Sequence, residues 1–534
     1  MKMTNQRILA KFVVAAVCGW LVAPATETFA GGVFNMGNGA EPKDLDPQIV
    51  TGVPESHILQ DLFEGLVGQD PKTLAPIPAV AESWKISKDN KTYTFILRKN
   101  AKWTNGDPVT AKDFVDAWTR LLTPVTAAEY AYQGYYMKNG KPFNEGKLKD
   151  ASQLGFKAID ATTLEVKLEN PTPFFLGLLA HHSLYPTHKA TVEKFGPRWT
   201  RPENIVSNGA FSLEKWEMNK IITLKKSETY WDKAVVTLDK VNFHPVEKQD
   251  TEEKLFRSKG LQVTNELPLE KIPFWQADKT GVYQQSPYLG IYHYWINVNK
   301  VPTNNKLVRQ ALNLGFDRES IVKYVTRGGQ NPALSFTPPG SGGFMPLARL
   351  PKDLSQLAKA KELLAKAGYP DGKGLPPIEI LYNTSDSHKK IAEAMQQMWK
   401  KNLGVNVVLV NQEWKVYLDT QTSHNFTLSR AGWIGDYNDA NTFLDMFMSD
   451  NGNNKAGFVN AKYDELLHSA EKEIDGQKRL KIFQAAEDIL MEELPMIPIY
   501  VYTRVYLKSK GVKGWDANIL DVHPRKYVSL VPSN

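Results

Sequence analysis

The sequence predicts a mixed α/β chain folded into lobes around a cleft. Three observations support this. Segments with the period of a strand alternate with segments that have the period of a helix. The chain has 534 residues and is 42% hydrophobic, which is enough for a large core and for more than one domain. It contains no short repeat, no low-complexity tract and no long Gly/Ser linker.

The N-terminus has the order of a secretory signal peptide. Lys2, Arg7 and Lys11 precede an apolar run over residues 12–23, and a polar stretch then ends at Ala30, where we expect cleavage. The apolar run is too short for a stable membrane anchor, which needs about 20 residues. We therefore expect the chain to be exported from the cytoplasm.

Cys18 is the only cysteine and lies inside this apolar run. A lipoprotein cut at Cys18 is the alternative, but Ala15-Ala16-Val17 before it lacks the usual leucine, which disfavours that reading. Cleavage after Ala30 would leave a chain without cysteine and therefore without a disulfide.

The charge is mildly positive and evenly spread. The formal net charge is +7, and Lys2, Arg7 and Lys11 against Glu27 account for +2 of it, which leaves +5. Charges of both signs are interspersed, which argues against a nucleic-acid partner. No later segment reaches the roughly 18 consecutive apolar residues of a spanning helix.

The first predicted elements lie between residues 91 and 168. Lys91–Arg98 and Thr162–Leu168 alternate apolar and polar residues, which predicts two strands. Between them, Thr110–Leu122 carries apolar residues at helical spacing, and Thr110 is a suitable N-cap.

A second group of elements follows after residue 350. Ser355–Ala367 is a predicted helix, because Leu357 and Leu364 fall near one face and Gly368 stops it. The short apolar run Ile378–Tyr382 then predicts a strand.

Lys389–Asn402 is the next predicted helix, and Gly404 ends it. Val405–Val410 follows as a strand, so the two strands around this helix should be parallel with a right-handed crossover. One apolar face of the helix is assigned to the core: Ile391, Met395, Met398 and Trp399. Gln477–Glu493 and Met496–Tyr502 complete the pattern as a late helix and a late strand.

Motifs of the common enzyme classes are absent from the sequence. There is no His-Glu-x-x-His, no Gly-x-Ser-x-Gly, no Gly-x-x-x-x-Gly-Lys-Ser/Thr and no pair of Cys-x-x-Cys motifs. We therefore expect no catalytic residue and no cofactor, with a secreted hydrolase kept as the alternative. His181, His182 and His188 lie close together, but neighbouring histidines on a regular element point in different directions, which disfavours a metal site.

The stretch from Arg430 to Asp439 is the strongest candidate for a binding site. It contains an arginine, a tryptophan and a carboxylate with two glycines, and we place it on an irregular connection, where binding groups are common. Asp436 beside Trp433 could seat a cationic group, and Arg430 an anionic one. The alternative is an ordinary turn with a buried tryptophan and a solvated aspartate.

Fragments along the whole chain carry a family resemblance: Leu45-Asp46-Pro47, Asp61-Leu62-Phe63-Glu64-Gly65-Leu66, Trp103-Thr104-Asn105-Gly106-Asp107, Asn208-Gly209-Ala210-Phe211, Thr229-Tyr230-Trp231-Asp232, Val308-Arg309-Gln310-Ala311-Leu312, Asn411-Gln412-Glu413-Trp414-Lys415 and the stretch from Arg430. In this order and spacing they resemble the periplasmic oligopeptide-binding proteins of ABC peptide importers, solute-binding protein family 5. The likeness covers nearly the whole chain after the signal peptide.

The resemblance implies a bilobal α/β fold, the type II periplasmic binding protein fold in its three-domain, peptide-binding form. Domain I would be discontinuous, with residues 31–63, 190–287 and 504–534. Domain II would be residues 64–189 and domain III residues 288–503, after a signal peptide over residues 1–30. The lobes would close over the ligand by a hinge motion, and an extended peptide would bind as an added strand.

The resemblance also implies roles for eight residues. Asp436 would receive the peptide α-ammonium, and a buried carboxylate does need such a partner. Tyr130, Trp414 and Trp433 would line side-chain pockets, Val53 and Gly432 would supply main-chain bonds, and Arg430 and His388 would meet the carboxyl end of the peptide. The alternatives are plain core for the two tryptophans, a buried acid as partner of Arg430, and a helix-start role for His388.

The sequence departs from the family's best-known enterobacterial member at several positions. Thr51, Gln421 and Thr326 replace an acidic residue, an arginine and a lysine, which puts the reading of the far end of the peptide in doubt. His293 replaces a tyrosine. Gly290 and Ile434 occupy the two positions that form a disulfide in that member.

The resemblance implies a monomeric, non-enzymatic periplasmic receptor for short peptides, largely independent of their sequence. Its partner would be an inner-membrane ABC permease with cytoplasmic ATPase subunits. A murein-peptide receptor is an alternative that Gln421 disfavours. Nickel, haem or dipeptide receptors of the same family also stay open, as does a periplasmic chaperone, which would need an exposed apolar surface.

Overall fold

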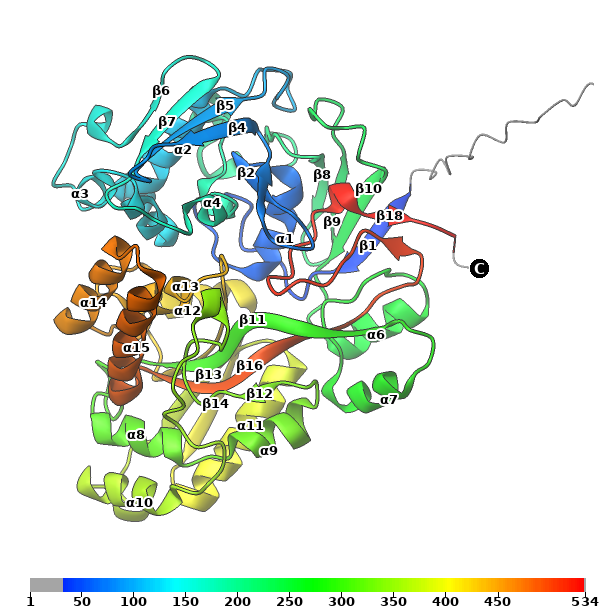
Figure 1. The fold of residues 1–534 in the computed structure, drawn as a ribbon. Coiled ribbons are helices and arrows are strands. Elements are labelled where there is room, and N and C mark those ends of the chain that lie inside the picture. The colour runs from blue at the N-terminus through cyan, green and yellow to red at the C-terminus, as the bar shows by residue number, and fades with distance from the viewer. Residues whose placement is uncertain (1–31, 533–534) are drawn as a thin grey trace, which may run out of the picture.

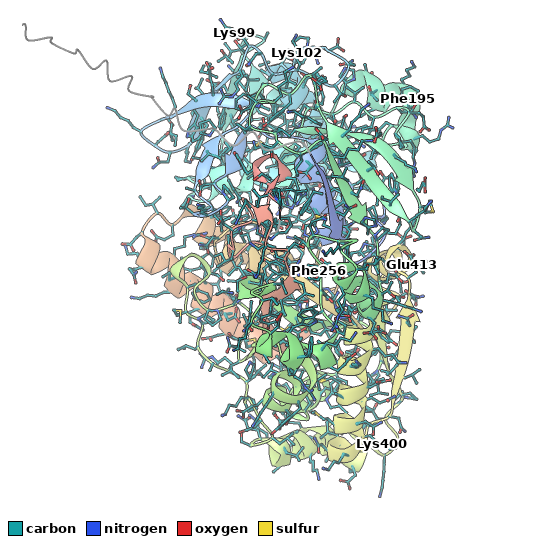
Figure 2. The ribbon with its side chains drawn as sticks, turned by 90° about the vertical axis from the view of Figure 1, so that its right-hand side faces the viewer. Lys99, Lys102, Phe195, Phe256, Lys400 and Glu413 are labelled. Carbon is teal, nitrogen blue, oxygen red and sulfur yellow. The ribbon has the colours of Figure 1, made fainter. Side chains whose placement is uncertain are left out.

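The computed structural model describes residues 32–532. The predicted signal peptide, with Cys18 and the expected cut after Ala30, lies outside the described residues. Figure 1 shows an upper part with two small sheets and a lower part built on one large sheet. In the view of Figure 2 the molecule is elongated, with Lys99 and Lys102 at one end and Lys400 at the other. Among the described helices, none is both long and apolar enough to cross a membrane.

The first sheet has four strands in the order β1-β10-β9-β8: β1 (Val33–Gly37), β8 (Phe211–Glu217), β9 (Ile221–Lys226) and β10 (Lys240–His244). β1 is parallel to β10, and the other pairs are antiparallel. Helix α1 (Val53–Leu62) packs near β8, and the short pair β17 (Val512–Lys513) and β18 (Ser529–Leu530) lies close to β1 (Figure 1).

The second sheet is antiparallel, in the order β4-β5-β7-β6: β4 (Ala81–Ile86), β5 (Thr92–Leu97), β6 (Phe156–Ala158) and β7 (Thr163–Lys167). The predictions of strands at Lys91–Arg98 and Thr162–Leu168 are confirmed. Helix α2 (Ala111–Leu122) confirms the predicted helix, and Thr110 and Asp113 form a capping box at its start. The pair β2 (Val67–Gln69) and β3 (Pro76–Pro78) leads into this sheet.

The third sheet has six strands in the order β12-β16-β11-β15-β13-β14: β11 (Tyr283–Ile296), β12 (Asn331–Pro332), β13 (Ile378–Asn383), β14 (Val407–Gln412), β15 (Leu428–Ile434) and β16 (Met496–Leu507). β13 and β14 are parallel neighbours, as predicted for the strands around the helix Lys389–Asn402. β16 continues five residues beyond the predicted end at Tyr502.

Helices surround the third sheet: α8 (Lys306–Leu314), α9 (Arg318–Ser320), α10 (Leu357–Lys366), α11 (Asp386–Leu403), α12 (Trp414–Thr422), α13 (Asn441–Leu444), α14 (Ala461–Lys472) and α15 (Gly476–Glu493). Those that were predicted are confirmed within a few residues. In α11, Ile391, Met395 and Trp399 are buried in the core, as expected of its apolar face. Outside this sheet lie α3 (Gly140–Asn144), α4 (Phe175–Leu178), α5 (Lys189–Phe195), α6 (Gln249–Arg257) and α7 (Ile272–Ala277).

The placement of Arg430–Asp439 on an irregular connection was wrong for its first half. Residues up to Ile434 belong to β15, which pairs along its length with β11. Gly432 is part of the strand and lies close to Tyr502: a Cβ there would lie 2.5 Å from the Tyr502 hydroxyl, so a larger residue would displace that side chain. Asp436 does follow the strand end on a connection.

Two long strands connect the large sheet to the rest of the molecule. β11 and β16 pair antiparallel, and their register shifts between Pro287 and Ile291. The apolar core is divided in a similar way. One large cluster lies under the first and second sheets, and another surrounds the third sheet. The two strands therefore run between two separately packed bodies.

Candidate functional site

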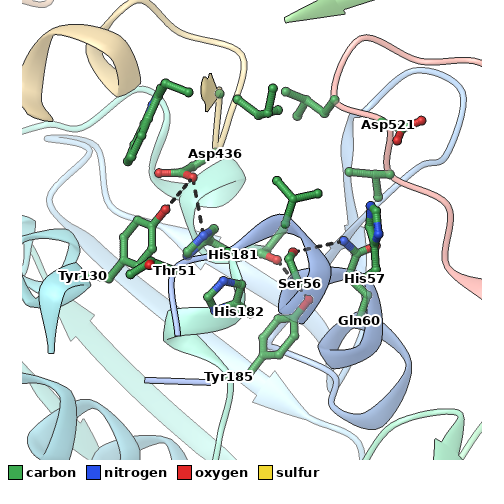
Figure 3. Close-up of a pocket in the computed structure, with 18 of the residues that line it drawn as sticks. Thr51, Ser56, His57, Gln60, Tyr130, His181, His182, Tyr185, Asp436 and Asp521 are labelled. Carbon is green, nitrogen blue, oxygen red and sulfur yellow. Dashed lines mark hydrogen bonds and ion pairs between the residues drawn. The ribbon is translucent and has the colours of Figure 1, made fainter. Parts of the chain in front are cut away.

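A cavity of about 240 Å³ lies between the upper and lower parts of the molecule. Its wall combines the start of α1, residues around 130 and 181, the end of β15 and residues 520–527. Figure 3 shows the side chains near Asp436 and their relation to α1. Seven of the eight residues predicted for the site line this cavity: Val53, Tyr130, Trp414, Arg430, Gly432, Trp433 and Asp436. His388 does not.

Asp436 is a buried carboxylate held by neutral donors. Gln133 Nε2 donates to Asp436 Oδ2 at 3.0 Å. The Tyr130 hydroxyl lies 3.4 Å from Oδ1 (Figure 3). The side chain is 7% exposed, and among the described residues no lysine or arginine forms an ion pair with it. Burial raises the pKa of Asp436 to about 7, although the hydrogen bonds from Tyr130, Gln133 and Thr442 act in the opposite direction.

His181 also faces this carboxylate, which the sequence did not reveal. Its Nε2 is 3.5 Å from Asp436 Oδ1, but burial, with His182 beside it, holds the pKa of His181 well below its usual value. The ring is therefore neutral and supplies no countercharge. The expectation that His181 and His182 point apart was wrong: they lie at a 3₁₀ turn and their ring centroids are 4.1 Å apart. Within residues 32–532 no group of acidic, histidine or cysteine side chains is arranged to hold a metal ion.

Aromatic side chains line the cavity, both beside Asp436 and at the start of α12. The Tyr130 ring lies 4.5 Å from His181 and 6.3 Å from Trp433. Trp414, the first residue of α12, donates from Nε1 to Glu55 at 3.1 Å and stacks on Tyr417. Both tryptophans are half-buried and line the cavity, so neither is plain core.

Arg430 is a cation among neutral partners. Its Nη1 donates to Asn383 at 3.2 Å, its Nη2 to the Tyr502 hydroxyl at 3.1 Å, and the guanidinium lies over the Tyr292 ring. Arg430 Nε has no partner, and no described carboxylate pairs with the side chain. The alternative of a buried acid as its partner therefore does not hold for the described chain. Since an arginine keeps its charge in proteins, the site holds an uncompensated positive group.

His388 lies behind Arg430 and away from the cavity wall. It is the third residue of α11, and the Ser385 hydroxyl caps the helix by accepting from its backbone N–H. Its Nδ1 is 3.3 Å from the Tyr292 hydroxyl, and burial, with Arg430 nearby, holds the pKa of His388 well below its usual value. His388 therefore has the helix-start position given as the alternative, and it contacts the cavity only indirectly.

The end of β15 has a free edge. β13 pairs with β15 only at Leu428 and Ser429. Beyond that point the carbonyl of Arg430 turns away from β11 and accepts from Tyr417 and Gln421. Polar groups two residues apart on a strand point the same way, so those of Gly432 also face the free side. An extended chain can add there as a strand.

The positions at which the sequence departs from the best-known enterobacterial family member fall in two groups. Thr51, Gln421 and His293 line the cavity. Thr326 lies outside the cavity wall, where it is 1% exposed and its hydroxyl donates to Gln330 at a distance of 2.9 Å. Gln421 Nε2 is occupied by Tyr417, Ser429 and Arg430. A set of residues that sequence reasoning did not find completes the wall: Gln133 and Tyr502 through their contacts, and Glu129, His181 and Lys455 directly.

The comparisons with known proteins agree on one family. The model described as "Bacterial extracellular solute-binding proteins, family 5 Middle" matches residues 75–455. The periplasmic oligopeptide-binding protein OppA of Escherichia coli is 41% identical over 528 residues, 96% of each chain. The OppA of Haemophilus influenzae, solved in complex with the peptide RPPGFSPFR, is 36% identical with a TM-score of 0.89 over 94% of this chain and 99% of that one.

Two structures of the murein tripeptide-binding protein MppA of Escherichia coli superpose on this chain with different TM-scores. One structure, 39% identical, superposes with a TM-score of 0.91 over 95% of this chain and all of that one. The unliganded open form superposes with a TM-score of only 0.64, at the same identity and with 95% and 99% of the chains covered. Since the sequence is the same, the difference lies in the arrangement of the parts. The present arrangement is therefore not the open one.

Proposed function

Because this chain belongs to family 5 of the bacterial extracellular solute-binding proteins, we propose that it captures short oligopeptides in the periplasm and delivers them to an ABC importer. One observation carries the proposal. The same strand, β15, holds an uncompensated cation, Arg430, and leads to an unpaired carboxylate, Asp436, with a free edge between them. A zwitterionic peptide in extended form is complementary to this arrangement, because its two charged ends and its backbone match all three features.

Asp436 would bind the α-ammonium of the peptide. A carboxylate enclosed without a cation is costly, so closing the cavity favours a ligand that brings one. Tyr130 and Gln133 come from the upper part of the molecule and Asp436 from the lower part, so the contact also joins the two. Tyr130, Trp414 and Trp433 would line pockets for side chains.

The backbone of the ligand would pair with the free edge of β15 near Gly432, opposite Val53 at the start of α1. Every peptide offers the same backbone donors and acceptors, so this mode of binding explains broad tolerance of sequence. Arg430 would bind the carboxylate end, with His388 supporting it through Tyr292.

The proposed division has three domains: residues 31–63, 190–287 and 504–534, residues 64–189, and residues 288–503. The three sheets fall in these ranges, apart from β11 and β16, which cross the boundaries. Their register shift, between Pro287 and Ile291, lies at the crossing and is our candidate for the hinge. We assign the chain no reaction and expect it to act as a monomer. Its partner would be an inner-membrane permease with cytoplasmic ATPase subunits.

The test is to incubate the purified protein with an equimolar mixture of short peptides, remove the unbound fraction and identify what remains by mass spectrometry. We expect intact peptides at about one per protein. Fragments would instead support a secreted hydrolase, the candidate from a different class. Failure to retain any peptide would overturn the proposal. A parallel arm with murein tripeptide tests the related alternative, which the occupied amide of Gln421 disfavours.

A further inference from the structure

A hydrogen-bonded network lies behind Asp436, and Ser183 is at its centre. Ser183 belongs to the 3₁₀ turn His182–Leu184, and Gln133 to the 3₁₀ segment Glu129–Tyr136. Ser183 is 0% exposed and Gln133 is 1% exposed, and neither lines the cavity wall. Any effect of Ser183 on a ligand in the cavity must therefore pass through the side chains that Ser183 contacts.

Ser183 donates hydrogen bonds to two side chains that face Asp436. Its hydroxyl donates to Gln133 Oε1 and also lies 2.9 Å from His181 Nδ1. Its backbone N–H donates to the same Nδ1 at 3.3 Å. A backbone N–H can only donate, so Nδ1 is the acceptor, and the neutral ring of His181 carries its proton on Nε2.

The opposite ends of the same two side chains present N–H groups to Asp436. Because Ser183 holds Gln133 Oε1, the amide Nε2 of Gln133 faces Asp436 and donates to Oδ2 at 3.0 Å. The protonated Nε2 of His181 faces Oδ1 at 3.5 Å (Figure 3). The donors thus run in one direction, from Ser183 through Gln133 and His181 to the carboxylate. An ionised carboxylate can only accept hydrogen bonds, so this arrangement suits its charged form.

The turn that carries Ser183 is anchored at the residues on either side of it. Trp118 Nε1 donates to the Leu184 carbonyl at 2.9 Å. His182 Nδ1 lies 3.0 Å from the Pro47 carbonyl. These buried contacts hold Ser183 in one position, which a residue that orients its neighbours requires.

We propose that Ser183 is a positioning residue for the peptide ammonium: it orients Gln133 and His181 so that both present N–H groups to Asp436. Without the Ser183 hydroxyl, the Gln133 amide can turn and present its oxygen to the carboxylate, where two acceptors repel each other. Ser183, Gln133 and His181 all lie within residues 64–189, so the network can be complete before Asp436 reaches it from the other body. The inference rests on the proposed function, since it names a residue that prepares the ammonium site.

The first experiment measures the affinity for tri-alanine by calorimetry. Ser183→Ala removes the hydroxyl and keeps the backbone N–H, and we expect it to weaken binding about tenfold, as loss of one buried hydrogen-bond partner does. Ser227→Ala is the matched control: Ser227 is a buried serine outside the cavity wall, its hydroxyl lies 3.2 Å from that of Thr229, and the variant should bind like the wild-type protein. Equal affinities of Ser183→Ala and the wild-type protein would overturn the inference.

The second experiment tests whether Ser183 acts through Gln133. Gln133→Met removes the amide donor, and we expect it to weaken tri-alanine binding about tenfold. Adding Ser183→Ala to Gln133→Met should weaken binding only about twofold more, because the side chain that Ser183 orients is gone. If Ser183 only supports the fold, the two losses would multiply to about a hundredfold, and that result would overturn the inference. Gln133→Met needs no change at Ser183, so an unchanged affinity in this variant would overturn the inference by itself.

Tri-alanine also separates the failure of the inference from the failure of the proposed function. If the wild-type protein does not bind tri-alanine, the proposed function fails. If the wild-type protein binds it and Ser183→Ala binds it equally well, only the inference about Ser183 fails.

Discussion

Gln133 donates a hydrogen bond to Asp436 at 3.0 Å although the two residues are 303 positions apart in the chain. The Tyr130 hydroxyl approaches the other carboxylate oxygen from the same side. Both donors are neutral. They fix the direction of the carboxylate, but they leave its charge uncompensated in a site from which water is largely excluded. A cationic ligand group would be stabilised here, because the carboxylate is held in a fixed direction and has no cationic partner.

Replacing Asp436 should therefore weaken peptide binding strongly. We expect Asp436→Ala to cost about 2–5 kcal/mol of binding free energy, as loss of one partner of a buried charge pair does. N-acetylated tri-alanine, which lacks the ammonium, should lose a comparable amount with the wild-type protein. Calorimetry measures both. Asp278→Ala is the control, because the Asp278 side chain lies outside the cavity wall and, within the described chain, accepts hydrogen bonds from Thr280 alone. Unchanged affinity in either arm would reject the role of Asp436.

Peptide affinity should depend on pH on both sides of neutrality. The closed cavity raises the pKa of Asp436 to about 7, so below pH 7 a protonated carboxyl stabilises the closed protein without peptide, this state competes with peptide binding, and affinity should fall. Above about pH 8 the peptide α-amino group, with its pKa of roughly 7.7–8.0, loses its proton and affinity should fall again. The maximum is expected between these values. A profile without the acidic limb would contradict the assignment, and Asp436→Asn should remove that limb.

The same shift determines which pH favours closure without ligand. A carboxyl whose pKa is higher in the closed state than in water stabilises that state when protonated, and this contribution is lost as the pH rises through 7. We therefore expect the peptide-free protein to close more readily below pH 7 than above it. X-ray scattering of the peptide-free protein at pH 6 and pH 8 measures this, with a smaller radius of gyration at pH 6 that disappears in Asp436→Asn. Equal radii at the two pH values would contradict it.

Arg430 should recognise the opposite end of the peptide. We expect Arg430→Met to weaken binding of tri-alanine by about 2–5 kcal/mol and to have little further effect on tri-alanine amide, whose carboxylate is gone. This double-mutant cycle distinguishes direct binding of the peptide carboxylate by Arg430 from a purely structural role of Arg430. If Arg430 only supports Asn383 and Tyr502, the variant would lose as much affinity for the amide as for the free acid.

The sequence predicts those elements whose signals are local. β5 and α2 follow from alternation and from the Thr110 cap, which need no distant partner. Helix α11 begins three residues before the predicted start, because its first turn is polar and only the Ser385 cap marks it. β15 was missed because its pairing comes from β11, far away in the chain.

The same limit holds for the site: the sequence reveals residues within one short stretch but not those brought in from distant parts of the chain. Asp436, Trp433 and Arg430 stand out as chemical types within one short stretch. Gln133 and His181 do not, since nothing near them in the sequence indicates that the fold brings them to Asp436. His388 carried a role through the resemblance alone, and its side chain contacts Tyr292 outside the cavity wall.

Gly290 and Ile434 should accept a disulfide when both are replaced by cysteine. They are cross-strand partners, and the register makes them a pair without mutual hydrogen bonds, for which Cα atoms lie about 4.5 Å apart. That separation is within the range of disulfides, roughly 4.4–6.8 Å. Ile434→Cys also removes the methyl group that a Cβ on Gly290 would meet at 2.4 Å, so the remaining close contact is with the Trp433 carbonyl oxygen at 2.9 Å, which a small shift of the strand must relieve.

We expect oxidation of Gly290→Cys/Ile434→Cys to be complete and to stabilise the fold by a few kcal/mol, at most about 4–5 in the loop-entropy model. Mass spectrometry with thiol labelling measures the bond, and chemical denaturation with and without reductant measures the stability. Free thiols under oxidising conditions would show that the two strands do not pair in this register at the end of the cavity.

Peptide binding should compact the molecule by moving the two bodies about β11 and β16. Both strands continue from the large sheet into the rest of the chain, and their register shift is the place where the pairing is least regular. The contacts of Asp436 with Tyr130 and Gln133, and of Lys455 with Glu129, can form only when the bodies are together. X-ray scattering should therefore show a smaller radius of gyration with saturating tri-alanine than without it.

Asp436→Ala at the same peptide concentration should stay at the larger radius, whereas Asp278→Ala should respond like the wild-type protein. An identical radius with and without ligand, in a sample that calorimetry shows to be saturated, would mean that the cavity admits peptides without a hinge motion.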